Sequence, residues 1–214
     1  MNYSRSERRD AGASLVEVLV AIGLFGVLST LLLGFALSTS RVTDDTRQFA
    51  NVSEDSRLVM ERLSRELRQA KEVTAVQLPV TSTDQTVLTF WTDFNGNGTK
   101  DLNAADPEVL TYRWVPATKE LTLTANDQNG TAVTRPMMSS SVSAFSISLY
   151  SSLWQYDTDA DGRSSWSELD AAGPPISNNK LDYIDVVALS LTVLEGPHAQ
   201  RYTTQVDLRN RNLN

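Results

Sequence analysis

The chain has 214 residues, a formal net charge of −7 at pH 7 and no cysteine. The lack of cysteine excludes a disulfide scaffold and a thiolate metal site. The acidic balance argues against nucleic acid as a main ligand, because phosphate groups are bound by basic surfaces. Hydrophobic residues make up 41% of the chain, which favours a globular body. They are unevenly placed, and the densest apolar run covers residues 13–37.

This apolar run predicts a membrane-spanning helix. Its 25 residues would form a helix about 37 Å long, which is enough to cross a bilayer core. Three arginines lie in the polar stretch 1–12 before it, and they favour a cytoplasmic N-terminus. The first proline of the chain is Pro79. Because no proline interrupts the chain before it, we expect one helix from Ser14 to Lys71.

Glu17 is the one charged residue in this apolar run. A carboxylate inside a spanning helix costs roughly 3 kcal/mol and usually has a partner. No basic residue lies between Ala13 and Ser40, so the partner must come from elsewhere. A cut after Gly12 would create an α-ammonium group at Ala13, which could pair with Glu17 on the same chain or on a neighbouring subunit.

The segment Gly12-Ala13-Ser14-Leu15-Val16-Glu17 resembles the prepilin cleavage and methylation motif of type IV pilins and type II secretion pseudopilins. The resemblance implies that a prepilin peptidase cuts between Gly12 and Ala13 and methylates Ala13. It also implies that Glu17 neutralises the N-terminus of a neighbouring subunit in a filament. The family usually has phenylalanine where this chain has Ala13.

Three other interpretations of this segment compete with the prepilin motif. A secretory signal has a shorter apolar core, of about 7–15 residues, although Ala36-Leu37-Ser38 offers a cleavage site for one. A plain membrane anchor accounts for the length of the run but not for Glu17. A buried core helix would not need the basic leader.

The predicted helix turns amphipathic in its second half. Apolar or small residues recur three or four apart and form one stripe: Phe49, Val52, Ser56, Val59, Leu63, Leu67 and Ala70. The stretch Leu58–Ala70 resembles the end of this helix in PilW-type and J-type minor pilins. The resemblance implies a low-abundance initiating or tip subunit.

After Pro79 the apolar period changes to two, which predicts strands. The expected strands are 86–91, 109–114, 121–124, 143–150, 184–193 and 202–208. The predicted fold class is therefore α+β and pilin-like, with the long N-terminal helix packed on an antiparallel sheet. The expected division is a leader at 1–12, a transmembrane or filament-core helix at 13–40, and a periplasmic or extracellular body at 41–214.

An acidic loop matches the D-x-D-x-D-G-x5-E calcium pattern at every defined position. Calcium takes six to eight oxygen ligands. They would come from the side chains of Asp157, Asp159, Asp161 and Glu168 and from the backbone carbonyl of Arg163. Ser165, at the ninth position, would hold a water ligand. The alternative interpretation is a solvated Asp/Gly turn.

An earlier loop repeats the first half of this pattern, with Asp93, Asn95, Asn97, Thr99 and Asp101 in the alternating positions. Its twelfth residue is Ala104, so the closing glutamate is missing, and Asp106 and Glu108 are the available substitutes. A simple Asn-Gly turn between strands explains the loop equally well. Calcium is thus a possible ligand of both loops.

No pattern indicates an enzyme. The one histidine, His198, follows Pro197 and is expected on the surface, and no nucleophile elbow accompanies it. The expected function is a minor pilin or minor pseudopilin of a type IV pilus, competence pilus or type II secretion pseudopilus. Its expected partners are a prepilin peptidase, other pilins and the inner membrane. The alternatives are a membrane-anchored calcium-dependent binding module and a tip adhesin.

Overall fold

The computed structural model describes residues 14–101, 108–127, 129–171, 180–196 and 198–208. The chain divides into two units, Met1–Arg47 and Gln48–Asn214. The long helix α1 (Leu15–Gln69) begins in the first unit. The predicted division at residues 12 and 40 stays a prediction.

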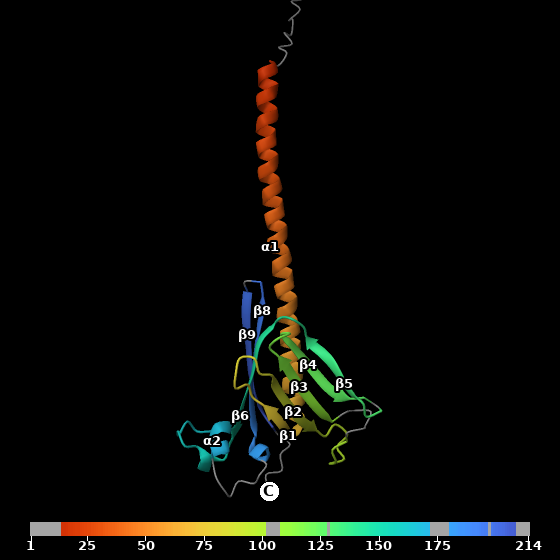
Figure 1. Ribbon diagram of the computed structural model, residues 1–214, viewed down its shortest axis with the longest axis vertical. Helices are drawn as coiled ribbons and strands as arrows, with labels where there is room; N and C mark the ends of the chain where they lie inside the picture. The colour runs from red at the N-terminus through yellow and green to blue at the C-terminus, as the bar shows by residue number, and fades with distance from the viewer. Residues whose placement is uncertain (1–13, 102–107, 128, 172–179, 197, 209–214) are drawn as a thin grey trace, which may run out of the picture. The chain divides into compact units, whose positions relative to one another are not determined.

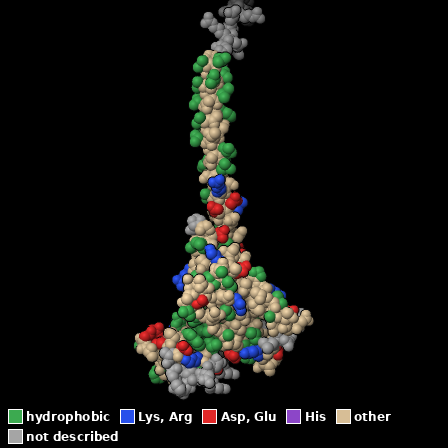
Figure 2. Space-filling model, in the orientation of Figure 1, with side chains coloured by type: hydrophobic (Ala, Val, Ile, Leu, Met, Phe, Trp, Pro, Cys, Tyr) green, Lys and Arg blue, Asp and Glu red, His purple; other side chains and the backbone are tan. Residues whose placement is uncertain are grey.

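The first unit consists of the N-terminal part of α1. Ser14 precedes the helix, and its side-chain Oγ accepts a hydrogen bond from the backbone N–H of Glu17 at 3.4 Å, as an N-cap residue does. Large apolar side chains such as Leu15, Phe25 and Phe35 are exposed, and Figure 2 shows hydrophobic side chains along this part. The helix is long and apolar enough to cross a membrane.

The end of α1 differs slightly from the prediction. The helix stops at Gln69, and strand β1 (Ala70–Gln77) follows without a linker, so Ala70 and Lys71 are in a strand rather than in the helix. β1 is rich in β-branched residues, which favour strands. Its first residue, Ala70, pairs with Thr92 in the next strand, and these pairings outweigh the helical period at this point.

Five strands form an antiparallel sheet in the order β1-β2-β3-β4-β5. The remaining strands are β2 (Thr86–Thr92), β3 (Val109–Val115), β4 (Glu120–Asn126) and β5 (Ala132–Met138). The predictions of β2, β3 and β4 are confirmed, whereas β1 and β5 were missed. Pro136 lies inside β5, and it weakens the strand pattern although an edge strand tolerates proline.

The other strands form a second antiparallel sheet in the order β7-β6-β8-β9. They are β6 (Val142–Ser151), β7 (Ser164–Ser165), β8 (Val186–Glu195) and β9 (His198–Asp207), with β8 starting two residues later than predicted. The α+β class is confirmed, but the strands form two sheets rather than one. Thr86 Oγ1 of β2 donates to the carbonyl of Phe145 in β6 at 3.1 Å, which ties the two sheets together.

The second unit has one core, made by the C-terminal part of α1 and both sheets. Figure 1 shows the strands beside this part of the helix. Val59, Leu63 and Leu67 of the predicted stripe are buried, which confirms that this face packs inward. Trp114 is buried, whereas Trp154 is 81% exposed and does not pack on a sheet. It belongs to the short 3-10 helix Trp154–Tyr156.

One polar contact crosses this core. Glu66 of α1 is buried, and its carboxylate accepts hydrogen bonds from Arg62 Nε at 2.7 Å and from the hydroxyl of Tyr112 at 2.5 Å. In the sequence, Arg62 and Glu66 are four residues apart, which predicts an ion pair on one face of the helix. The structure adds Tyr112 of β3, so that the helix and the first sheet share a buried charged group.

Candidate functional site

The N-terminal motif places Glu17 in the first turn of α1. Its backbone N–H is bonded to the carbonyl of Ser14 at 2.9 Å, and Ser14 therefore holds the helix start through both its carbonyl and its hydroxyl. The predicted cleavage residues, Gly12 and Ala13, lie outside the described residues. The described helix thus begins two residues after the predicted new N-terminus.

Glu17 finds no charge partner on its own helix. Its side chain is exposed, and it takes part in none of the four ion pairs among the described residues. The first basic residue further along α1 is Arg41, which a helical rise of about 1.5 Å per residue places roughly 36 Å away. A partner for this carboxylate must therefore come from outside the described residues.

The Asp157–Glu168 loop gathers three of its predicted ligands. One carboxylate oxygen each from Asp157, Asp159 and Asp161 lies within 4.8 Å of the others. Asp157 Oδ2 accepts the backbone N–H of Gly162 at 2.9 Å, whereas its Oδ1 is buried without a hydrogen-bond partner. Gly162 has φ +91°, a conformation that favours glycine.

Glu168 lies across the loop but does not join the three aspartates. Its Oε1 accepts hydrogen bonds from the N–H and hydroxyl of Thr158, both at 2.8 Å. Its Oε2 accepts from the N–H and hydroxyl of Ser165, at 2.7 and 2.8 Å. Ser165 and Glu168 thereby form a capping box at the start of the short helix α2 (Trp166–Ala171), which sequence reasoning missed.

Arg163 is the predicted ligand that would bind through its backbone carbonyl. Arg163 follows the glycine, and its side-chain Nη1 donates to Gln205 Oε1 of β9 at 2.9 Å, while its guanidinium group lies 5.8 Å from the centre of the Tyr150 ring. These contacts attach the loop to the second sheet. They leave the backbone carbonyl as the atom that Arg163 could offer to a cation.

The hydrogen bonds and charges of this loop shift two pKa values in opposite directions. Hydrogen bonds from Ser165, and then from Thr158, lower the pKa of Glu168 to about 2. The N–H of Asp161 lowers the pKa of Asp159, but desolvation and the nearby carboxylates of Asp161 and Glu168 outweigh it and raise that pKa. Desolvation and the crowded negative charge together raise the pKa of Asp159, and a cation would relieve the charge.

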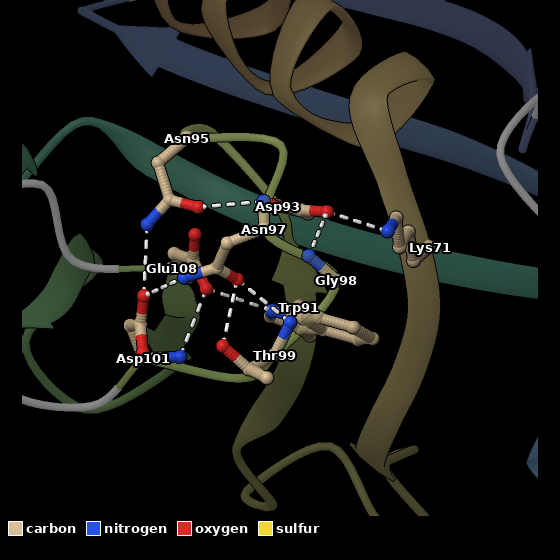
Figure 3. A network of polar contacts seen from close by, with 9 residues as sticks. All are labelled: Lys71, Trp91, Asp93, Asn95, Asn97, Gly98, Thr99, Asp101 and Glu108. Carbon is tan, nitrogen blue, oxygen red and sulfur yellow. Dashed lines mark hydrogen bonds and ion pairs between the residues drawn. The ribbon is translucent and has the colours of Figure 1, made fainter.

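The Asp93–Asp101 loop is held by a polar network, drawn in Figure 3. Asn95 Nδ2 and Asn97 Nδ2 both donate to Asp101 Oδ2, at 2.8 and 2.7 Å. Asn97 Oδ1 accepts from the N–H and the hydroxyl of Thr99, both at 2.7 Å. All five residues predicted from the sequence, including Asp93, therefore lie in one folded loop.

Asp93 connects this loop to β1. Its Oδ2 accepts hydrogen bonds from Lys71 Nζ at 2.5 Å and from the backbone N–H of Gly98 at 3.0 Å. The Lys71 hydrogen bond is the main reason why the pKa of Asp93 lies below its usual value. Lys71 was not among the predicted site residues, because the sequence placed it at the end of the helix.

Glu108 is brought into the loop from the chain that leads into β3. It is fully buried, and its Oε2 accepts from the N–H of Asp101 at 2.9 Å and from Trp91 Nε1 at 3.2 Å. Of the two substitutes considered for the missing twelfth ligand, Glu108 therefore lies at the loop, and Asp106 is outside the described residues. In the sequence, the sign that Glu108 could reach the loop was its place directly before the predicted strand 109–114.

Comparison with known proteins bears on the N-terminal segment. A family model for the prokaryotic N-terminal methylation motif matches residues 8–33, which include Gly12, Ala13 and Glu17. No curated protein and no solved structure matches the chain. The matched motif is that of structural subunits rather than of enzymes. The chain thus carries the prepilin N-terminal methylation motif at the head of a long apolar helix followed by antiparallel sheets, the architecture of a type IV pilin-like protein.

Proposed function

We propose that this chain is a minor pilin or minor pseudopilin, made as a single-pass inner-membrane precursor and then incorporated into a filament. The observation that carries the proposal is the coincidence of three features. The methylation motif matches residues 8–33, the apolar side chains of α1 are exposed from Leu15 onward, and the carboxylate of Glu17 has no ion-pair partner among the described residues. An assembled filament core supplies a partner for both the apolar surface and the charge.

The choice of a minor subunit over the main shaft subunit is part of the proposal. It rests on the resemblance of Leu58–Ala70 to the helix end of PilW-type and J-type minor pilins. An initiating or tip subunit is needed in few copies, so that a body with two sheets and long acidic loops is tolerated. The machine is a type IV pilus, a competence pilus or a type II secretion pseudopilus.

The first test is processing of the precursor. The full chain is co-expressed with a prepilin peptidase, extracted from membranes, and its intact mass and N-terminal sequence are measured. The proposal predicts a chain that starts at Ala13, with or without a methyl group. Gly12→Val places a branched side chain at the cut and should block it, whereas Ala11→Val makes a related change one residue earlier and should not. A chain that starts at Met1 or near Ser38 would refute the proposal.

A second test is assembly. Glu17→Gln keeps the size and shape of the side chain but removes the charge, and we expect it to be cut normally and to be lost from sheared filaments. Glu54→Gln makes the same change at an exposed position of α1 outside the apolar run and should assemble. Normal assembly of Glu17→Gln would favour the membrane-anchored binding module instead.

The Asp157–Glu168 loop is proposed to bind calcium outside the cytoplasm. Three carboxylates within 4.8 Å of one another and the unpartnered buried Asp157 Oδ1 support this proposal, since calcium prefers such oxygen ligands. Both Glu168 oxygens now accept hydrogen bonds, so this side chain would exchange them for the ion or remain a capping group.

Calcium titration calorimetry on the full chain in detergent micelles tests this loop. Asp157→Asn removes the carboxylate at the first loop position, where the calcium pattern admits only aspartate, and should weaken calcium binding on the order of tenfold or more. Asp207→Asn makes the same change on an exposed strand residue and should have no effect. Equal calcium affinity in the two variants would contradict the proposal.

A further inference from the structure

Two buried carboxylate oxygens at the Asp93–Asp101 loop have no hydrogen-bond partner: Asp93 Oδ1 and Glu108 Oε1. The side chain of Asp93 is 3% exposed and Glu108 is 0% exposed, so water does not readily replace the missing partners. Buried charges are normally paired or coordinate metals, because an unpaired buried charge destabilises the folded state. This loop contains two carboxylates that each have one unpartnered buried oxygen. The two unpartnered buried oxygens therefore point to a cation at this loop.

The charge around these oxygens has the same sign. Asp93, Asp101 and Glu108 place three carboxylates at the loop, and the ammonium group of Lys71 faces only Asp93 Oδ2. The second nearby lysine, Lys100, pairs with Glu72 at 3.4 Å. Both lysines also lie over the ring of Trp91, at 5.3 and 5.4 Å from its centre. The carboxylates thus keep an excess of negative charge that the two lysines do not neutralise.

The carboxamide oxygen of Asn95 stays available, whereas that of Asn97 accepts two hydrogen bonds from Thr99 and would exchange them for an ion. Both amide nitrogens donate to Asp101 Oδ2, which turns the carboxamide oxygens of Asn95 and Asn97 away from Asp101. Asn95 Oδ1 accepts one backbone N–H, that of Asn97, at 2.9 Å, and a carbonyl oxygen has two lone pairs. Figure 3 shows Asn95 and Asn97 joined to Asp101 by these hydrogen bonds.

We propose that this loop binds a second calcium ion, closed by Glu108 instead of by a glutamate at its twelfth position. Asp93, Asn95, Asn97 and the backbone carbonyl of Thr99 supply the other oxygens. Asp101 is a positioning residue, because its carboxylate holds the two carboxamides and its N–H holds Glu108. The donors are all oxygen atoms, which suits a hard divalent cation.

This assignment explains how the sites differ. In the later loop the closing glutamate is near in sequence and already has hydrogen-bond donors on both oxygens. In the earlier loop the glutamate comes from the start of β3, and one of its oxygens is left without a donor. Calcium here would therefore link the loop to the first sheet, and it would stabilise that sheet as well as the loop.

The test uses the full chain in detergent micelles, in an Asp157→Asn background that weakens calcium binding by the later loop. Calcium titration calorimetry is combined with melting curves in calcium and in EGTA. Glu108→Gln should reduce calcium affinity on the order of tenfold or more and abolish the rise in melting temperature that calcium produces. Glu72→Gln, the same change at a neighbouring glutamate that pairs with Lys100, should leave both unchanged.

The melting curves in EGTA separate a ligand from a merely structural residue. Glu108→Gln removes a buried uncompensated charge, so the variant should melt at the same or a higher temperature than its parent when calcium is absent. Calcium-independent destabilisation by Glu108→Gln, unchanged calcium affinity in that variant, or the absence of calcium binding to the parent would each overturn the proposal. Cleavage before Ala13 does not depend on this site, so the two proposals fail separately.

Discussion

The hydroxyl of Tyr112 provides a direct test of how α1 is attached to the first sheet. It donates to Glu66 Oε2 at 2.5 Å, and both residues are buried. Tyr112→Phe removes this donor while it keeps the aromatic ring, whose centre lies 6.1 Å from that of Phe90 in a stacked arrangement. The substitution therefore isolates one hydrogen bond to a buried carboxylate.

The expected loss follows from the charge on the acceptor. A hydrogen bond to a charged group contributes about 1.5–3 kcal/mol, and Glu66 retains Arg62 as its other partner, so the carboxylate is weakened but not isolated. We expect Tyr112→Phe to lower the free energy of unfolding by about 2 kcal/mol. For a body of this size that corresponds to a melting temperature lower by about 4–8 °C.

Tyr202→Phe is the matched control. The Tyr202 hydroxyl also joins a strand to α1, but it donates to an uncharged backbone carbonyl, that of Ser53, at 3.1 Å. A neutral hydrogen bond contributes about 1 kcal/mol, so this variant should melt only about 2–4 °C lower. Denaturant unfolding of both variants, followed by circular dichroism, measures the difference. A loss for Tyr112→Phe no larger than that for Tyr202→Phe would refute the assignment of a buried charged contact.

An alkaline titration gives a second check on the same contact. Desolvation, and then the charge and hydrogen bond of Glu66, raise the pKa of Tyr112. The stabilisation is complete below the unfolded tyrosine pKa of about 10 and is lost as the pH rises above it, because the unfolded chain then releases a proton that the folded chain keeps. The stability difference between the natural chain and Tyr112→Phe should therefore shrink above pH ~10.

Two further predictions concern the core and the later loop. Leu67→Ala in the buried face of α1 should cost about 2–5 kcal/mol, whereas Leu58→Ala, where the leucine is 57% exposed, should cost far less; equal losses in denaturant unfolding would contradict the packing of this face. The pKa of Glu168 is lowered to about 2, so its stabilisation is complete above the unfolded value of about 4.3 and is lost as the pH falls toward 2. In EGTA, the stability difference between the natural chain and Glu168→Gln should shrink over this range, and a constant difference would show that the carboxylate does not hold the loop.

Several features could be predicted because they depend on neighbours in the sequence. The span of α1 follows from an unbroken apolar run, a helical period and the absence of proline, and the prediction differs from the structure by one residue at the start and two at the end. Phe145, Ile147 and Leu149 alternate with serines, and they are buried as the period of two indicates. The matched methylation motif lies in the same local stretch.

Other features were missed because a local signal was weak or misleading. β5 was missed because it contains Pro136. A proline lacks the backbone N–H that an interior strand needs, so it argues against a strand in the sequence, but β5 lies at the edge of its sheet and tolerates it. Lys71 continued the helical pattern, yet its chain segment is paired with β2 and its ammonium group is bound by Asp93. Trp154 has a large apolar side chain, but it lies in a short 3-10 helix that leaves it exposed.

The amino-acid sequence alone determined the long N-terminal helix, the motif that contains Glu17 and the order of donors within each acidic loop, because these depend on residues a few positions apart. The tertiary structure decided that the strands form two sheets and that Tyr112 meets Glu66 across 46 residues. It also decided that Glu108 closes against the loop of Asp93. Such contacts depend on how the helix and sheets pack, and burial makes each unpaired charge costly enough to require a partner.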